Sequence, residues 1–156
     1  MSLAATIPNE DEYQFWFERS KIEYANEKMR ANHLSESEAK ALSESSFARL
    51  LPQQLETPDQ YIRVIKDEEQ QLVGFYWLAA IGAPDNRKGF IYDIVVEESM
   101  RGKGHGRAMM NLIEALAKDL KLARIALHVF ASNKTAVNLY QSMGYETTDL
   151  VLEKAL

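Results

Sequence analysis

The chain has 156 residues, 46% of them hydrophobic and 26% charged, and its formal net charge is −5. A chain of this length is typical of one domain with a single core, so a second domain is not expected. The composition is that of a folded globular protein, which excludes the disordered and fibrous classes.

The chain contains no cysteine, which excludes disulfides, cysteine nucleophiles and thiolate metal ligands. Its three histidines, His33, His105 and His128, show no ligand spacing, so no metal site is predicted. No apolar run approaches the roughly 20 residues that cross a bilayer, and the first residues lack the pattern of a signal peptide. These features predict a cytoplasmic protein without a membrane partner.

The acidic excess is confined to the first 60 residues, which carry eleven acidic and six basic side chains. An acidic face argues against a nucleic-acid partner, because the phosphate backbone is itself anionic, and it mildly favours a cationic partner. An acidic helical surface that only maintains solubility is the alternative interpretation.

Residues 3–8 predict an opening strand that ends at Pro8. Asn9 is the expected N-cap of a helix over 10–30, where large side chains recur at helical spacing. The residues at that spacing are Tyr13, Trp16, Phe17, Ser20 and Tyr24. A second helix is expected from Ser35, where Glu38 completes a capping box, to Pro52.

Two β-rich runs, 61–66 and 71–82, are joined by an acidic turn and predict an antiparallel hairpin. The run 90–96 is rich in β-branched and aromatic residues, which predicts a mostly buried central strand. A helix is expected over 104–120, because apolar residues recur there at i, i+3, i+4, i+7 and i+11.

A strand is expected over 123–130, then a helix over 133–144 that is capped by Asn133 and ended by Gly144, then a final strand over 147–156. The order of elements from residue 61 is therefore β, β, β, α, β, α, β. It predicts an α/β fold, an α+β sandwich, whose sheet begins antiparallel and contains a strand–helix–strand crossover.

The segment 100–110, MRGKGHGRAMM, places three glycines and three cations at the start of the helix over 104–120. Bare backbone, free helix N–H groups and positive charge at that position favour a phosphate or pyrophosphate ligand. Neither a Walker loop nor the G-x-G-x-x-G spacing of dinucleotide folds is present. A flexible surface turn is the alternative.

Two motifs carry a family resemblance. RGKGHG, residues 101–106, resembles the Q/R-x-x-G-x-G/A pyrophosphate loop of GNAT-type N-acetyltransferases, and it follows a strand as it does in that family. NKTAVNLYQSMGY, residues 133–145, resembles the N-x-x-A-x-x-L-Y-x-x-x-G-F/Y segment of the same family. The chain departs from the family in having Glu98 where a proline is common and His105 where an aliphatic residue is common.

The resemblance implies a single domain with a mixed, centrally splayed β-sheet flanked by helices. Residues 1–60 would form mainly the acceptor-side helices, and residues 61–156 the cofactor-binding core. The implied function is acetyl-CoA-dependent transfer of an acetyl group to a primary amine of a small molecule or peptide by direct attack. A catalytically inactive acyl-CoA-binding sensor or regulatory module is the alternative. No nucleic-acid or membrane partner is expected, and a homodimer is compatible with the resemblance.

The resemblance also assigns residues. Those expected to bind the cofactor are Ile94, Val95 and Val96 through main-chain amides, Arg101, Gly102, Lys103, Gly104, His105, Gly106 and Arg107 in the loop, and Asn133 and Ala136 in the second motif. Tyr140 is the expected proton donor to the departing thiolate, although an aromatic residue on a helical stripe is otherwise a core residue.

An amine acceptor is protonated at pH 7, so a base is needed. Asp93 is the expected base, with Glu97 in reserve; the alternative for Asp93 is a strand carboxylate that faces solvent or pairs with a cation. Tyr24, Glu23, Trp77 and Tyr92 are candidates for an aromatic and acidic acceptor pocket. Trp16, Phe17 and Trp77 are equally consistent with an ordinary core.

Overall fold

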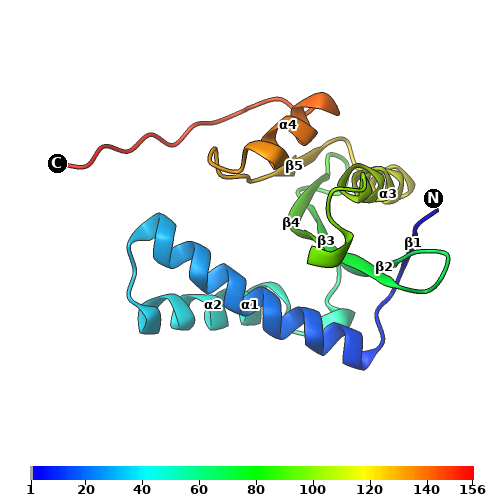
Figure 1. Ribbon diagram of the computed structural model, residues 1–156, viewed down its shortest axis with the longest axis horizontal. Helices are drawn as coiled ribbons and strands as arrows, with labels where there is room; N and C mark the ends of the chain where they lie inside the picture. Colours follow the sequence, from blue (N-terminus) through cyan, green and yellow to red (C-terminus); the bar gives the residue numbers. More distant parts are fainter. Residues whose placement is uncertain (1) are drawn as a thin grey trace.

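A computed structural model describes residues 2–156, which form a five-stranded sheet between two layers of helices (Figure 1). The strands are β1 (Ala4–Thr6), β2 (Gln60–Lys66), β3 (Leu72–Ile81), β4 (Lys88–Val96) and β5 (Ile125–Leu127). The helices are α1 (Glu10–Asn32), α2 (Glu36–Leu50), α3 (His105–Asp119) and α4 (Lys134–Ser142), and short 3-10 turns lie at Gln54–Glu56 and Glu98–Met100.

The sheet has the order β1-β2-β3-β4-β5. Neighbouring strands from β1 to β4 are antiparallel, and β4 and β5 are parallel. The predicted hairpin, β2–β3, and the predicted crossover, β4–α3–β5, are both confirmed. The crossover matters for function because it places the start of α3 beside the end of β4.

Each face of the sheet has its own hydrophobic cluster, because successive side chains along a strand point to opposite faces. On one face, Phe75 and Trp77 of β3 pack with Tyr13, Trp16 and Phe47 of α1 and α2. On the other face, β3 and β4 pack against α3 and α4. The members of that second cluster include Tyr76, Leu78, Ile91, Met109, Met110, Ile113, Tyr140 and Met143. The predicted α/β sandwich is therefore confirmed.

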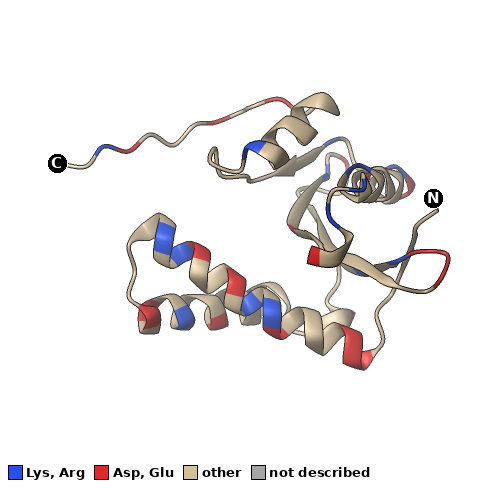
Figure 2. Ribbon diagram, in the orientation of Figure 1, with Lys and Arg blue, Asp and Glu red and all other residues tan. Residues whose placement is uncertain are grey.

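The two N-terminal helices begin where their capping boxes predict. The Asn9 side chain accepts a hydrogen bond from the Glu12 amide at 2.8 Å, and the Glu12 carboxylate accepts one from the Asn9 amide at 2.9 Å. Ser35 and Glu38 make the same reciprocal pair. Acidic side chains gather in the first turns of both helices, where they complement the helix dipole (Figure 2).

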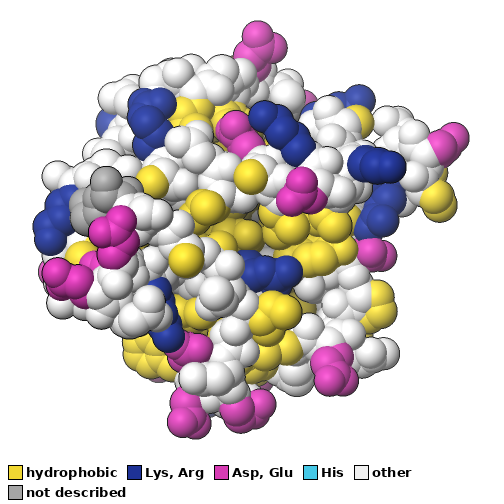
Figure 3. Space-filling model, turned by 90° about the vertical axis from the view of Figure 1, so that its right-hand side faces the viewer, with side chains coloured by type: hydrophobic (Ala, Val, Ile, Leu, Met, Phe, Trp, Pro, Cys, Tyr) yellow, Lys and Arg dark blue, Asp and Glu magenta, His cyan; other side chains and the backbone are white. Residues whose placement is uncertain are grey.

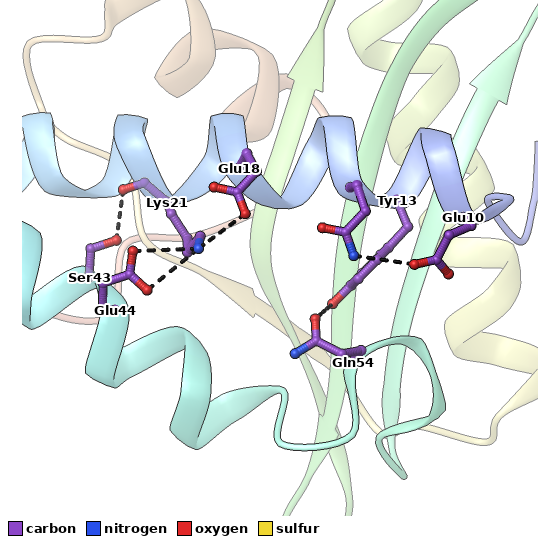
Figure 4. Close-up of polar contacts among 8 residues, drawn as sticks. Glu10, Tyr13, Glu18, Lys21, Ser43, Glu44 and Gln54 are labelled. Carbon is purple, nitrogen blue, oxygen red and sulfur yellow. Dashed lines mark hydrogen bonds and ion pairs between the residues drawn. The ribbon is translucent and has the colours of Figure 1, made fainter.

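Polar contacts fix α1 against α2 and the turn that follows it (Figure 4). The Ser43 hydroxyl donates to the Lys21 carbonyl at 2.7 Å, and the Lys21 ammonium lies 3.5 Å from the Glu44 carboxylate. At the other end of α1, the Tyr13 hydroxyl donates to Gln54 Oε1 at 2.7 Å. These bonds hold the two helices as one layer over the sheet.

The sheet is splayed between β4 and β5. Trp77 lies opposite Asp93 but Leu78 lies opposite Ile91, so Tyr92 is an extra residue that forms a β-bulge on β4. Pairing with β5 covers only Gly89–Ile91 of β4. Beyond the bulge, the strand from Asp93 to Val96 pairs with β3 alone and leaves its other edge open. The expectation of a centrally splayed sheet is thus confirmed.

Two sequence predictions about the C-terminal third are wrong. The strand expected over 123–130 is paired only over Ile125–Leu127, because β4 diverges at its bulge and offers no partner farther along. The strand expected over 147–156 does not form: these residues are exposed, without secondary structure, and extend away from the body of the molecule (Figure 1). A strand-like sequence needs a neighbouring edge to pair with, and this segment does not lie on one.

The surface is mixed in character. Figure 3 views the molecule from the right-hand side of Figure 1 and shows hydrophobic side chains gathered across the middle of that face, with charged side chains around them. Within residues 2–156, no helix is both long enough and apolar enough to cross a membrane.

Candidate active site

A cavity of about 350 Å³ lies where the sheet splays, between the helical layer of α1 and α2 on one side and α4 on the other. Its lining includes the two predicted catalytic residues, Asp93 and Tyr140. All four residues predicted for the acceptor pocket also line it, namely Glu23, Tyr24, Trp77 and Tyr92. The tertiary structure therefore brings together residues that the sequence separates by more than a hundred positions.

Asp93 is the carboxylate that the structure holds most firmly in this cavity. Its Oδ2 accepts a 2.9 Å hydrogen bond from the Trp16 indole Nε1 and a 3.0 Å bond from the Ser20 hydroxyl. Burial raises the pKa of Asp93 to about 6, and the two hydrogen bonds oppose that rise because they favour the charged form. A carboxylate with this pKa is still mostly ionised at pH 7 but is a stronger base than an ordinary aspartate.

Glu97, the reserve candidate for the base, is engaged elsewhere. Its two carboxylate oxygens accept hydrogen bonds from both terminal nitrogens of the Arg19 guanidinium, at 2.9 and 2.8 Å. A bidentate pair of this kind holds the carboxylate in one orientation and occupies both of its oxygens. Glu97 does not line the cavity. The structure therefore favours Asp93 over Glu97.

Tyr140 lies on α4 and is half-buried against the cluster that α3 and α4 share. Burial raises the pKa of its phenol, and the nearby charge of Asp93 raises it further. The hydroxyl therefore keeps its proton at neutral and mildly alkaline pH. Tyr140 packs against the hydrophobic cluster and also lines the cavity. A role in packing and a role as a proton donor are therefore compatible.

The glycine loop, residues 101–107, leads from the end of β4 into α3. Gly102 and Gly104 have φ values of +76° and +79°, and a Cβ at either position would meet nothing within 4 Å. Their backbone conformation, and not a lack of space, is what requires glycine. Gly104 is the N-cap of α3, so the first N–H groups of the helix are without intrahelical acceptors.

The side chains of the glycine loop differ in what they contact. Arg101 folds back so that its Nε donates to the Val96 carbonyl at 3.0 Å, which ties the loop to β4. The Arg107 guanidinium donates to the Ser142 hydroxyl of α4 at 2.6 Å. His105 is 4% exposed, so its side chain is not available to a ligand. Lys103 is exposed.

Gly106 serves packing. A Cβ there would lie 3.2 Å from Leu139 Cδ2, so this glycine allows α3 and α4 to approach each other. Asn133, which the resemblance places among the cofactor ligands, uses its side chain to cap α4 by accepting from the Ala136 amide at 3.2 Å. Both Asn133 and Ala136 line the cavity.

The open edge of β4 presents main-chain groups at every second residue. The Glu97 amide donates to the Val73 carbonyl of β3, so by alternation the amides of Val95 and Asp93 also face β3. The amides of Ile94 and Val96 face the open edge. Of the three main-chain positions expected to contact a cofactor, two are therefore turned toward the cleft and Val95 is turned away from it.

The mouth of the cavity is acidic and aromatic. Glu23 and Glu27 are exposed, lie one helical turn apart on α1, and form no ion pair with any residue in 2–156. The rings of Tyr92 and Trp77, which line the same cavity, are tilted by 33° to each other with centroids 4.6 Å apart. Lys28 also lines this region, with its ammonium 5.4 Å from the centre of the Tyr24 ring.

Sequence reasoning did not find that Trp16 and Ser20 hold Asp93. Both lie on the buried stripe of α1, and Trp16 is fully buried, as a core residue is. The signal that was available is Ser20, a hydroxyl on an otherwise aromatic stripe, because a buried hydroxyl needs a hydrogen-bond partner. Nothing in the sequence indicated that the partner lies on β4.

Comparison with known proteins matches this arrangement to one family. The sequence model of the Acetyltransferase (GNAT) family matches residues 22–145. Two uncharacterized N-acetyltransferases of Bacillus subtilis are similar over nearly the whole chain: YycN, 33% identical over all of both chains, and YdgE, 31% identical over 94% of each. The crystal structure of YycN superposes with a TM-score of 0.92 over 99% of each chain, at 32% identity. A spermine/spermidine N(1)-acetyltransferase of Bacillus subtilis is 37% identical over 50% of this chain and 55% of its own.

Proposed function

This chain belongs to the GNAT acetyltransferase family, and we propose that it moves an acetyl group from acetyl-CoA to a primary amine of a small molecule or peptide by direct attack. The observation that carries the proposal is the meeting of Asp93 and Tyr140 in one cavity beside the open edge of β4. The family supports acetyl transfer in general. The acceptor and the roles of individual residues are inferred from the site.

The residues present fit acetyl-CoA. The glycine loop offers helix N–H groups, two glycines whose conformation keeps side chains away, and the exposed Lys103, which together suit a pyrophosphate. The bond from Arg101 to Val96 joins that loop to the open strand edge, where the Ile94 and Val96 amides can pair with an extended chain. When bound, acetyl-CoA supplies the acetyl thioester.

Asp93 receives the proton of the amine in this proposal. An alkylamine has a pKa of about 10.4, so it enters the site protonated. The pKa of Asp93 is raised from 3.8 to about 6, which brings it about two pKa units closer to that of the amine. The free-energy cost of moving the proton from the amine to the carboxylate is therefore lower by roughly 3 kcal/mol. The bonds from Trp16 and Ser20 keep the carboxylate oriented while it accepts the proton.

Tyr140 acts at the departing sulfur. Its raised pKa keeps the phenol protonated, so its hydroxyl donates a hydrogen bond or a proton to the thiolate. A main-chain amide of the open β4 edge, at Ile94 or Val96, donates to the oxygen on which charge develops. These groups act on opposite ends of the bond that breaks, while Asp93 acts on the nucleophile.

We infer that the acceptor is a cation with more than one positive charge. One amine would be deprotonated at Asp93, and Glu23 and Glu27 are positioned to hold a second cationic group at the cavity mouth. The rings of Tyr24, Trp77 and Tyr92 are suited to cation–π contact with it. A polyamine is one such acceptor, and a relative over half of this chain is named for acetylating spermine and spermidine.

A panel of amines tests both parts of the proposal by measuring the release of free CoA thiol. Turnover with any amine supports the transferase, whereas tight binding of acetyl-CoA without turnover across amino acids, polyamines, peptides and aminoglycosides supports the alternative of an acyl-CoA-binding sensor or regulatory module. For the acceptor, a diamine should show a lower KM than the monoamine of equal carbon number.

The double variant Glu23→Gln/Glu27→Gln should remove that preference by raising KM for the diamine about tenfold, with kcat nearly unchanged. Glu18→Gln is the matched control, because Glu18 is an exposed glutamate of the same helix outside the cavity lining. Equal KM values for diamine and monoamine would contradict the dicationic acceptor and leave the transferase intact.

A further inference from the structure

Arg19 and Glu97 form an ion pair that the proposed chemistry does not use. Arg19 lies on α1, and Glu97 directly follows the last residue of β4. Both terminal nitrogens of the guanidinium donate to the carboxylate, at 2.9 and 2.8 Å, and the two side chains are only 25% and 17% exposed. A fork of this kind fixes the relative orientation of the two segments that carry it, which a single contact does not.

Two aromatic rings hold the guanidinium in place. Its central carbon lies 4.7 Å from the centre of the Phe15 ring and 5.7 Å from the centre of the Phe75 ring on β3. Phe15 is 51% exposed and belongs to neither hydrophobic cluster, so its contact with the guanidinium gives this exposed ring a role. The rings restrict the Arg19 side chain to the position in which its fork meets Glu97.

The ion pair lies at one end of the strand segment whose outer edge is open. Beyond its bulge, β4 pairs with β3 alone, and at its end the Glu97 amide donates to the Val73 carbonyl at 2.8 Å. A strand end with one neighbour frays more readily than one with two, because half of its main-chain groups have no partner. The other end of the segment is Asp93, which Trp16 and Ser20 hold. A short stretch of α1 therefore fixes both ends of the open segment.

We propose that Arg19 and Glu97 are positioning residues for acetyl-CoA, because they hold the end of β4 against α1 and so keep its open edge in place for the extended arm of the cofactor. This inference rests on the proposed function, in which the Ile94 and Val96 amides pair with that arm. The same strand end also steadies the glycine loop, since the Arg101 guanidinium donates to the Val96 carbonyl at 3.0 Å. An edge that is already ordered binds a ligand more tightly than one that the ligand must order.

Two other roles for the ion pair predict different measurements. An ion pair that only stabilises the fold would change the fraction of folded protein, and therefore kcat, but not the affinity of the folded protein for CoA. If Glu97 were the base, its amide variant would lose turnover and keep its affinity for the cofactor. The affinity for CoA therefore separates the three roles.

Calorimetry of CoA binding to the full chain, with steady-state kinetics, tests the proposal. Glu97→Gln should raise the Kd for CoA and the KM for acetyl-CoA about tenfold, and should leave the KM for the amine within about twofold. Arg19→Lys keeps the charge but loses the fork, so it should have the same effect. The double variant should bind no more weakly than either single variant, because the two residues act through one contact.

Lys66→Gln is the matched control. Lys66 of β2 forms another ion pair with α1, to the Glu12 carboxylate at 2.7 Å, and its side chain is similarly half-buried. It does not line the cavity, so this variant should leave the Kd for CoA unchanged. An unchanged Kd in Glu97→Gln would overturn the proposal, and a large loss of kcat with that unchanged Kd would make Glu97 the base.

Amide hydrogen exchange without cofactor tests the positioning itself. In Arg19→Lys, the Glu97 amide should exchange about tenfold faster. The Ala80 amide, which donates to the Asp59 carbonyl at 2.9 Å, should keep its rate. Equal acceleration of both amides would show a general loss of stability and would overturn the proposal. If the unaltered protein binds no CoA, the proposed function fails as well, whereas failure of the variants alone leaves the proposed function intact.

Discussion

The indole Nε1 of Trp16 donates a 2.9 Å hydrogen bond to Oδ2 of Asp93, which joins α1 to β4 across 77 positions of the sequence. Ser20 donates to the same oxygen. Both bonds favour the ionised carboxylate, whereas burial favours the neutral acid, and burial prevails. The balance leaves Asp93 with a pKa of about 6, which is close to the working pH of a general base.

Trp16→Phe should shift the acid limb of the pH profile of kcat/KM upward from about 6 by about half a unit to one unit. The variant removes a hydrogen-bond donor that stabilises the ionised carboxylate of Asp93, so the neutral acid becomes relatively more stable and the pKa rises. Trp77→Phe is the control, because the Trp77 indole is equally buried but donates to Gln60 at 2.6 Å. An unchanged acid limb in Trp16→Phe would show that the hydrogen bond from Trp16 does not affect the pKa of the group that limits activity at low pH.

Asp93→Asn should lower kcat by about 10²-fold or more, since the amide accepts no proton from the amine. The same variant should raise the free energy of unfolding at pH 7 by up to about 3 kcal/mol, because it removes a buried charge. Urea titration measures the second effect. A destabilised variant would contradict the raised pKa.

The contribution of Asp93 to the stability of the unaltered protein should fall as the pH rises from about 4 to about 6. Between the ordinary pKa of aspartate, 3.8, and the raised value of Asp93, about 6, the folded state binds more protons than the unfolded state. The contribution of Asp93 to the free energy of unfolding therefore falls through this window and is constant above it. Asp93→Asn should remove that part of the slope when urea midpoints are compared at pH 4 and pH 7.

Tyr140→Phe should lower kcat by about tenfold to 10²-fold and leave the affinity for acetyl-CoA within about twofold. The ring remains in its half-buried position, so packing is preserved and only the hydroxyl is lost. Steady-state kinetics with calorimetry of acetyl-CoA binding separates the two effects. A fully active variant would assign Tyr140 to the core alone.

Gly104→Val should abolish measurable binding of CoA with little loss of fold. A β-branched residue at φ +79° is strained by about 1–2 kcal/mol and places its side chain where the loop backbone should meet the pyrophosphate. Gly82→Val is the control, because Gly82 also has a positive φ, +105°, but lies in the turn between β3 and β4. Unchanged affinity in Gly104→Val would remove the loop from the cofactor site.

Much of the fold, and the glycine loop of the candidate site, could be predicted from local features of the sequence. Capping boxes at Asn9 and Ser35 located both N-terminal helices, and hydrophobic spacing located α3. The glycine loop could be recognised because its residues are consecutive and their chemistry depends on backbone near a helix start. All of these features depend on interactions between residues that are close together in the sequence, so they can be predicted without knowing how distant segments pack.

The rest of the fold and of the candidate site depends on contacts between segments that are far apart in the sequence. The sequence of 147–156 has the composition of a strand, but whether a strand forms depends on an edge that another part of the fold, or another chain, must supply. In the same way, Asp93 could be named as a candidate base from its place on a strand, but its raised pKa arises from burial under α1, with Trp16 and Ser20 as its donors. Burial and hydrogen bonding between segments are properties of the packed structure, so only the tertiary structure decided which carboxylate, Asp93, has a raised pKa and which, Glu97, is held by an arginine.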